Sequence, residues 1–229
     1  MRAAGARALR RDLNSNAERF PQDVLELQAL LGPVQPGQHV CAVPGAGTEV
    51  PLWILGSSLF GAQVAGMLGL PFAYASHFAP DALREALQVY RTHFQASKQL
   101  AQPHAMVGVN VFAADSDVDA RRLFTSLQQQ FANLYRGTPV QIQPPRDDMD
   151  AFWSPAERAA VDRTLQYAVV GGPDTVREKL QDFVALTGAD ELMVTASIFD
   201  HRARVRSFEI AMDARHALTR AARGRRGAT

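Results

Sequence analysis

The sequence predicts an α/β fold in which parallel strands alternate with helices. Short apolar runs of strand length recur along the chain, and a stretch with helical spacing of apolar residues follows each of them. Glycine, proline and serine lie at the junctions, as expected for the turns between strands and helices. Strands that are joined through a helix run parallel in one sheet and connect with a right-handed crossover.

The first predicted element is an amphipathic helix over 21–31, because apolar residues follow Pro21 at helical spacing. Glycine and proline residues at 32–37 end it. A short extended piece, 39–43, then leads to the first strand, which we expect at 52–55. With 229 residues, of which 47% are hydrophobic, the chain can bury one substantial core, and a single domain over 1–229 is expected.

The segment 51–80 reads as strand, turn, helix and strand. After the run at 52–55 come three small residues suited to a tight turn with exposed backbone N–H groups: Gly56, Ser57 and Ser58. A helix over 59–68 follows, and Gly69 ends it as a C-terminal glycine would. A second strand is expected at 72–75.

The rest of the chain continues the alternation. Two further strands are predicted, 106–113 and 192–198. Helices are predicted from Pro80 to Phe94, from the N-cap Ser116 to Gly137, and over 155–167, 173–187 and 204–222. The segment 138–154 shows neither period and is interpreted as a surface excursion of the type that lies over a binding mouth, while 220–229 is expected to be a disordered tail.

The turn after the first strand is the sharpest candidate site. Backbone N–H groups at a helix N-terminus favour a phosphate, and the serine hydroxyls would add donors. The alternative is that Ser57 or Ser58 only caps the helix, and spacing alone does not separate the two hypotheses.

His77 follows the second strand and is a candidate for contact with a ligand, although a lone histidine is more often structural. Strand alternation places Tyr74 and Ser76 on one face and Ala75 and His77 on the other, so only one of these pairs can line a site. Weaker candidates are Asn110, which interrupts an apolar strand, and Ser197 and Asp200, which end the last strand; Asp200 is equally well explained as a helix N-cap.

Other motifs point away from further chemistry. Residues 171–174, which read GGPD, match neither phosphate-loop pattern and are interpreted as a turn that starts a helix. The remaining histidines show no metal-ligand spacing, so no metal is predicted. A net charge of +1 argues against nucleic-acid binding. One cysteine, no signal-peptide pattern and no run of eighteen apolar residues predict a cytoplasmic protein without a membrane partner.

The sequence of the turn also carries a family resemblance. LGSS at 55–58, followed by GLPFAYASHFAP at 69–80, resembles the bacterial luciferase-like, flavin-dependent monooxygenases, in particular their LGSS…GLPFAxASHFAP subgroup. Five further segments extend the resemblance along nearly the whole chain: ARALRRDL, FPQDVLELQ and AVPGAG on the N-terminal side, and YAVVGGPDTVREKL and ADELMVTASIFDHRARVRSFEI on the C-terminal side.

This resemblance implies the C-terminal part of a (β/α)8 TIM barrel, in which the four predicted strands are the family's strands five to eight. Family members are about a hundred residues longer at the N-terminus, so we expect an N-terminally truncated barrel. Half a barrel leaves two sheet edges and an apolar inner face open to water.

The resemblance also implies an activity: a monooxygenase that acts on a small organic substrate with O2 and reduced FMN supplied by a flavin reductase, with a deazaflavin as the less favoured cofactor. It places the phosphate-binding positions on Ser57, Ser58 and the backbone of Phe60 and Gly61, next to Gly56, and it implies a homodimer. The catalytic residues are not identified. Two alternatives remain: an inactive remnant that at most binds flavin phosphate or associates through its open edges, and a phosphosugar-binding barrel.

Overall fold

The computed structural model describes residues 19–226, with side chains up to His216. Contacts between Cα atoms divide the chain into two compact units, one up to Leu52 and one from Trp53 onward. The sequence analysis expects one domain, and the structure separates the first helix from it. The reason is that this helix buries a single residue, Val24, and so contributes little to a shared core.

Unit 1 consists of helix α2 (Phe20–Leu31) and the loop that follows it. The loop folds back on the helix end, because the N–H groups of Gly47 and Glu49 donate to the carbonyl groups of Gly32 and Leu31. The extended piece expected at 39–43 is present as irregular chain without strand pairing.

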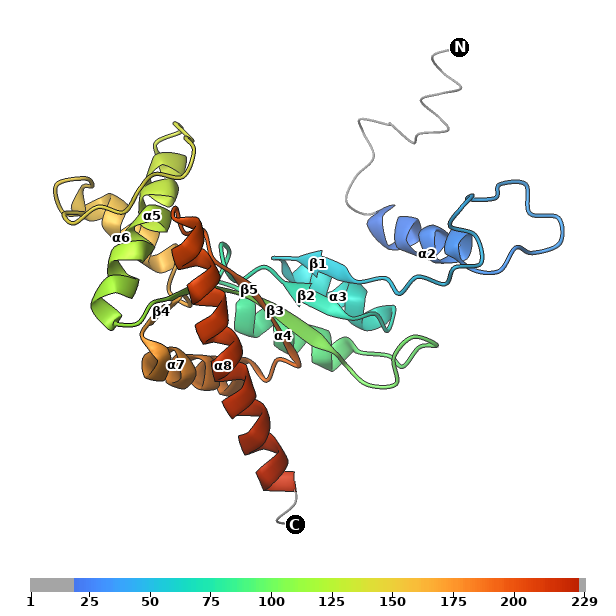
Figure 1. Ribbon diagram of the computed structural model, residues 1–229. Coiled ribbons are helices and arrows are strands. Elements are labelled where there is room, and N and C mark those ends of the chain that lie inside the picture. Colours follow the sequence, from blue (N-terminus) through green and yellow to red (C-terminus); the bar gives the residue numbers. More distant parts are fainter. Residues whose placement is uncertain (1–18, 227–229) are drawn as a thin grey trace. The chain divides into compact units, whose positions relative to one another are not determined.

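Unit 2 contains a five-stranded sheet in which every observed pairing is parallel. Its strands are β1 (Ile54–Gly56), β2 (Phe72–Tyr74), β3 (Ala105–Ala113), β4 (Val169–Gly171) and β5 (Glu191–Thr195). The long strand β3 is the centre of the sheet: it pairs with β2 near its start, with β4 near its end and with β5 along its middle (Figure 1).

Helices connect the strands of unit 2. They are α3 (Leu59–Met67), α4 (Leu83–His93), α5 (Asp117–Tyr135), α6 (Pro155–Thr164), α7 (Pro173–Thr187) and α8 (His201–Arg226). Helices α3 and α4 pack on each other beside β1 and β2, whereas α7 and α8 pack on each other, with α8 against β3 (Figure 1). Helix α8 continues to Arg226, into the segment for which the sequence predicts a disordered tail, and 227–229 lie outside the described residues.

The predicted parallel α/β fold is confirmed, and the four predicted strands are present with small shifts at their ends. One strand was not predicted: β4 (Val169–Gly171) lies directly before the turn that the sequence analysis places at 171–174 and shares Gly171 with it. Val169 and Val170 are followed directly by Gly171, Gly172 and Pro173, which are typical of a turn, so only the pairing of β4 with β3 reveals this strand.

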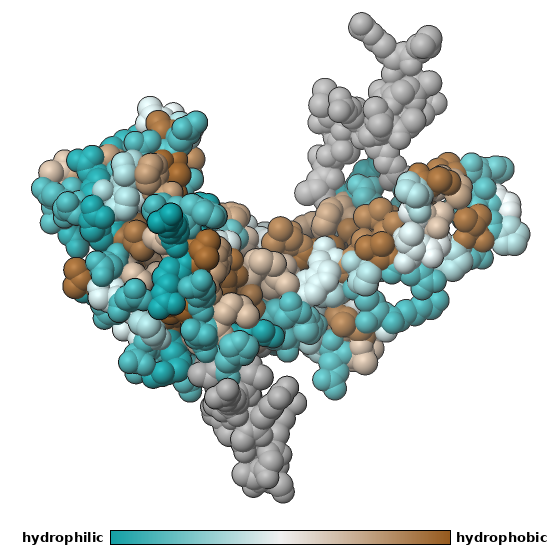
Figure 2. All heavy atoms as spheres, viewed as in Figure 1, coloured by the Kyte–Doolittle hydropathy of each residue, from teal (hydrophilic) through white to brown (hydrophobic). Residues whose placement is uncertain are grey.

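The two faces of the sheet differ in their cover. Ile54, Phe72 and Val107 are at most 4% exposed, and they lie on the face against the helices. On the opposite face, Leu55 is 71% exposed and Met193 is 53% exposed. Figure 2 shows hydrophobic residues at the surface where Figure 1 draws β1 and β2. The apolar inner face that the sequence analysis expects is therefore open.

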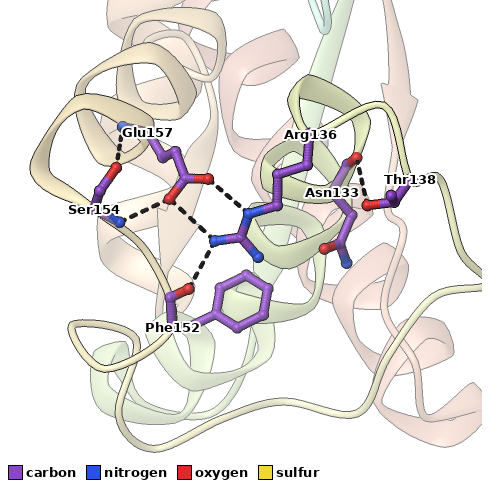
Figure 3. Close-up of polar contacts among 6 residues, drawn as sticks. All are labelled: Asn133, Arg136, Thr138, Phe152, Ser154 and Glu157. Atoms are coloured by element: carbon purple, nitrogen blue, oxygen red, sulfur yellow. Dashed lines mark hydrogen bonds and ion pairs between the residues drawn. The ribbon is translucent and has the colours of Figure 1, made fainter.

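The excursion at 138–154 contains no helix or strand, but its two ends are joined by an ion pair (Figure 3). Arg136, at the end of α5, donates two hydrogen bonds to the Glu157 carboxylate, at 2.6 and 3.0 Å, and a third to the carbonyl oxygen of Phe152. Glu157 also accepts from the backbone N–H of Ser154, which completes a capping box at the start of α6. These contacts close the excursion into a loop.

The hydrogen bonds from Arg136 and from the Ser154 amide lower the pKa of Glu157 to about 2. A carboxyl whose pKa is lowered by folding stabilises the protein above its unfolded value near 4.5, and this stabilisation is lost as the pH falls through 2. We therefore expect the stability difference between the wild type and Glu157→Gln to be constant above pH 5 and to shrink steadily between pH 4.5 and 2. Urea unfolding at a series of pH values measures it.

In the Arg136→Ala background, the same substitution at Glu157 should show a much smaller dependence on pH, because Arg136 is the largest cause of the shift. An unchanged pH dependence in that background would contradict this account of the ion pair.

Candidate functional site: the turn after β1 and the pocket after β2

The predicted phosphate turn lies at the carboxyl edge of the sheet. Strand β1 ends at Gly56, in register with Tyr74 of the parallel strand β2, and α3 begins at Leu59. Loops at this edge of parallel α/β folds carry the ligand sites. The turn therefore occupies the position that a phosphate site requires.

Ser58 is the N-cap of α3. Its backbone is extended, with φ −128° and ψ 157°, and its hydroxyl oxygen accepts a hydrogen bond of 3.3 Å from the N–H of Gly61. The capping role weighed in the sequence analysis is thus confirmed for Ser58. The Gly61 amide is used by this cap, which leaves the amides of Leu59 and Phe60 at the first two helical positions, where no intrahelical carbonyl is available.

Ser57 and Gly56 form the open part of the turn. Ser57 is exposed, and a Cβ placed on Gly56 would meet no atom within 4 Å, so there is room for a ligand there. On the neighbouring strand β2, the hydroxyl of buried Tyr74 donates to the carbonyl oxygen of Ser57 at 3.3 Å and fixes the position of that peptide. Burial raises the pKa of Tyr74, so its hydroxyl stays protonated as a donor.

The turn at the start of α7 is different. The Asp117 carboxylate accepts from the N–H of Gly172 at 2.6 Å, and this hydrogen bond lowers the pKa of Asp117. A Cβ on Gly171 would lie 2.8 Å from the same carboxylate and 2.4 Å from Thr175. A side chain of the protein therefore takes the place of an anion here, which agrees with the interpretation of 171–174 as a structural turn.

His77 lies beside a pocket of about 280 Å³ at the carboxyl edge of β2, β3 and β5. Asn110, Thr195 and Ser197 line the same pocket, and α5 covers it with Gln130 and three apolar side chains. Tyr74 and Ser76 are instead buried, Ser76 through a hydrogen bond to the carbonyl oxygen of Gly108. Of the two pairs given by strand alternation, Tyr74 and Ser76 are buried, and His77 of the other pair borders this pocket.

The His77 ring packs directly against Gly108. A Cβ on Gly108 would lie 2.2 Å from Nδ1 of His77, so the ring occupies the space that any other residue at 108 would fill. Nδ1 is buried and has no hydrogen-bond partner within the described part of the chain. Burial lowers the pKa of His77, which favours the neutral imidazole.

A short polar chain fixes the floor of this pocket. Asn110, 4% exposed, donates to the carbonyl oxygen of His77 at 2.6 Å and accepts from the hydroxyl of Thr195 at 2.8 Å. Asn110 therefore both lines the pocket and bonds across the sheet. Asp200 does not belong to it, because its carboxylate caps α8 by accepting from the N–H of Ala203 at 2.8 Å.

Sequence reasoning missed the parts that support these residues. The sequence does not predict that Tyr74 bonds to Ser57 or that the His77 ring packs against Gly108, because both contacts depend on strand register. The S-x-x-E spacing of Ser154 and Glu157 was a readable signal for a capping box. Among the described residues, no group of three or more His, Cys, Asp and Glu side chains could hold a metal, and no helix could cross a membrane.

Fold and site together define a class: a parallel α/β chain with an open turn at a helix N-terminus after one strand and a polar pocket after the next. The sequence model of the luciferase-like monooxygenase family matches residues 9–191. The chain therefore belongs to the luciferase-like monooxygenase family.

Two curated relatives are 50% identical to the chain. One is a luciferase-like monooxygenase of Escherichia coli K12, matched over 211 residues, which are 92% of this chain and 63% of the relative. The other is the uncharacterized protein YvbT of Bacillus subtilis 168, matched over 209 residues, which are 91% of this chain and 62% of the relative. The chain thus spans a little under two thirds of the length of these relatives.

Solved structures give the same fold. The crystal structure of apo-MsnO8 superposes with a TM-score of 0.73 and 29% identity, over 91% of this chain and 63% of that one. The monooxygenase RslO1 from Streptomyces bottropensis superposes with a TM-score of 0.57 at 15% identity, over 95% of this chain and 65% of that one, and this likeness shows the fold alone.

Proposed function

We propose that this chain provides the C-terminal barrel strands of a flavin-dependent monooxygenase, and that the turn between β1 and α3 binds the phosphate of FMN. The observation that carries the proposal is the open helix N-terminus at the carboxyl edge: Ser57 is exposed, Gly56 has free space above it, and two amides of α3 have no intrahelical partner. Family membership supports a flavin rather than another phosphorylated ligand.

The residues of the turn fit such a group. The hydroxyl of Ser57 and the amides of Leu59 and Phe60 would donate to the phosphate oxygens, and the dipole of α3 would favour the negative charge. Ser58 keeps the first turn of the helix in place. Bound reduced flavin would supply the electrons for the activation of O2, with a separate flavin reductase as the source.

His77 has a different role in the proposal. Its neutral ring, held against Gly108, lines the pocket in which a small organic substrate would sit beside the flavin. Because Nδ1 is buried against Gly108, Nε2 is the ring nitrogen left for a hydrogen bond to a ligand, and the neutral ring places no charge in the pocket. Asn110 keeps the His77 backbone in position.

The serines of the turn provide a matched test. Ser57→Ala should leave the stability of the free protein unchanged, because this side chain is exposed, but it should reduce the stabilisation by FMN. Ser58→Ala should cost about 1 kcal/mol even without ligand, because it removes the N-cap. Thermal melting with and without FMN measures both. In the wild type, FMN at a hundred times its dissociation constant should add about 2.7 kcal/mol.

Riboflavin, which lacks the phosphate, is the matched ligand control. It should stabilise the wild type less than FMN does, and Ser57→Ala should not change its effect. Equal stabilisation by FMN and riboflavin, or no stabilisation by FMN, would show that the turn does not hold the phosphate.

A second candidate function follows from the open sheet face. With Leu55 71% and Met193 53% exposed, the chain presents an apolar surface that favours association, with another copy or another partner, over turnover. In that case it would bind flavin phosphate, or self-associate, without catalysis. Gel filtration and oxygen consumption with reduced FMN separate the two candidates, since only the first consumes oxygen in a substrate-dependent way.

A further inference from the structure

A second, larger pocket lies away from the turn and from His77. It has a volume of about 730 Å³, it is open to solvent, and it is bordered by the first half of α5, the end of the 138–154 excursion, α6, β4 and α7. Pockets that hold small ligands in proteins have volumes of about 300–1,000 Å³. The proposed flavin site does not use any of the residues that line it.

The lining of this pocket is basic. Five cations border it: Arg121, Arg122, Arg146, Arg158 and Lys179. Three acids also border it, and two of these are engaged, Asp147 with Arg122 at 2.6 Å and Asp150 with Arg158 at 3.2 Å. The lining therefore carries an excess of positive charge.

Three of these cations have no acidic partner in the described part of the chain, and one of the three, Lys179, donates a hydrogen bond to the carbonyl oxygen of Val170 at 3.2 Å. Within the described residues, Arg121, Arg146 and Lys179 form no ion pair. The charge of Asp117 acts on Arg121 and Lys179, but its carboxylate is bound to the Gly172 amide and does not line the pocket. A bound anion would supply the missing counter-charge.

The walls also offer apolar and aromatic surface. Phe124, Trp153 and Val170 line the pocket beside the cations. A planar ring fits against such a wall.

The wall formed by the excursion is fixed to α5. Buried Thr125 accepts from the N–H of Arg146 at 2.9 Å, and buried Gln129 donates to the carbonyl oxygen of Pro144 at 3.0 Å. The Arg146 guanidinium lies 5.0 Å from the centre of the Phe152 ring. This wall is therefore held in place by specific contacts.

We propose that this pocket is a binding site for an organic anion in which a planar ring carries phosphate groups, a nucleotide in chemical class. The phosphates would lie against Arg121, Arg146 and Lys179, and the ring against Trp153 and Phe124. The site is separate from the flavin turn, so the chain would take two ligands.

Tryptophan fluorescence tests the proposal directly, because the chain has two tryptophans, Trp53 and Trp153. Trp53→Phe leaves Trp153 as the only emitter. Titration of this variant with ADP should change the emission in a saturable way, and 1 M NaCl should weaken the binding by screening the charges. Arg121→Ala and Arg146→Ala, each in the Trp53→Phe background, should weaken ADP binding about tenfold.

Arg202→Ala is the matched control, because Arg202 is exposed on α8 and does not line the pocket; it should leave ADP binding unchanged. Arg121→Lys, which keeps the charge, should bind more tightly than Arg121→Ala. No saturable change with millimolar ADP would overturn the proposal, and so would equal weakening by Arg202→Ala. Equal affinity for inorganic pyrophosphate and ADP would also overturn it, since the ring would then contribute nothing. The absence of FMN from the experiment keeps its result independent of the proposed function.

Discussion

Replacing Gly69 by alanine should destabilise unit 2 by about 2–5 kcal/mol. Gly69 ends α3 with φ +63°, and an L-residue in this left-handed region costs about 1–2 kcal/mol. In addition, its new Cβ would lie 2.3 Å from the carbonyl oxygen of Gln95 and 2.6 Å from Cβ of Ser97, and such overpacking costs about 1–3 kcal/mol. Chemical denaturation of the variant and the wild type measures the sum.

Gly137 is the control that separates the two contributions. It also has a positive φ, +72°, at the end of α5, but a Cβ there would meet no atom within 4 Å. Gly137→Ala should therefore cost only the conformational part. If both alanine variants lost the same stability, the close approach of Gln95 to Gly69 would not contribute, and the path of the chain between α4 and β3 would need revision.

The substitution of Gly69 should also affect the candidate site, because Gly69 and the proposed phosphate turn lie at opposite ends of α3. The Leu70 N–H donates to the carbonyl oxygen of Ala65, and the Ser97 hydroxyl donates to that of Gly69, which fixes the entry into β2. A shift of this end would move the helix whose first amides are proposed to bind phosphate. We expect Gly69→Ala to reduce stabilisation by FMN as well.

How much the sequence predicts depends on whether a feature is local. The ends of α3 could be predicted from the sequence, because the serine that caps the helix and the glycine that ends it act only on neighbouring backbone. The same holds for α5 and its N-cap Ser116. Strand β4 could not be predicted, because its pairing with β3 forms only once the chain is folded. The division at Leu52 could not be predicted either, because the small buried face of α2 is evident only in the folded chain.

The site follows the same rule. The turn at Gly56 and Ser57 could be located from its residue types, and the fold places it at the carboxyl edge of the sheet. The packing of the His77 ring against Gly108 could not be predicted from the sequence. Gly108 is 31 positions away, and the two residues come together only through the pairing of β2 with β3. The basic pocket gathers cations from separate elements that no spacing connects.

The second large effect is expected at Phe112, where truncation to alanine should cost about 3–5 kcal/mol. Phe112 is fully buried on β3 and packs in a cluster with Leu127, Val161 and Ile198. Its ring meets that of Phe124 in an edge arrangement at 5.1 Å. This cluster joins α5, α6 and the segment after β5, so a cavity there would loosen all three at once.

Because Phe124 and Trp153 pack on the same cluster and also line the basic pocket, Phe112→Ala should affect that pocket more than the phosphate turn. In the Trp53→Phe background, the emission of Trp153 should shift toward that of solvent-exposed tryptophan before global unfolding. Phe199→Ala, at a side chain that is 49% exposed, is the control and should change neither stability nor emission by a comparable amount. A Phe112→Ala variant as stable as the Phe199→Ala variant would mean that the cluster is not the core that supports the excursion.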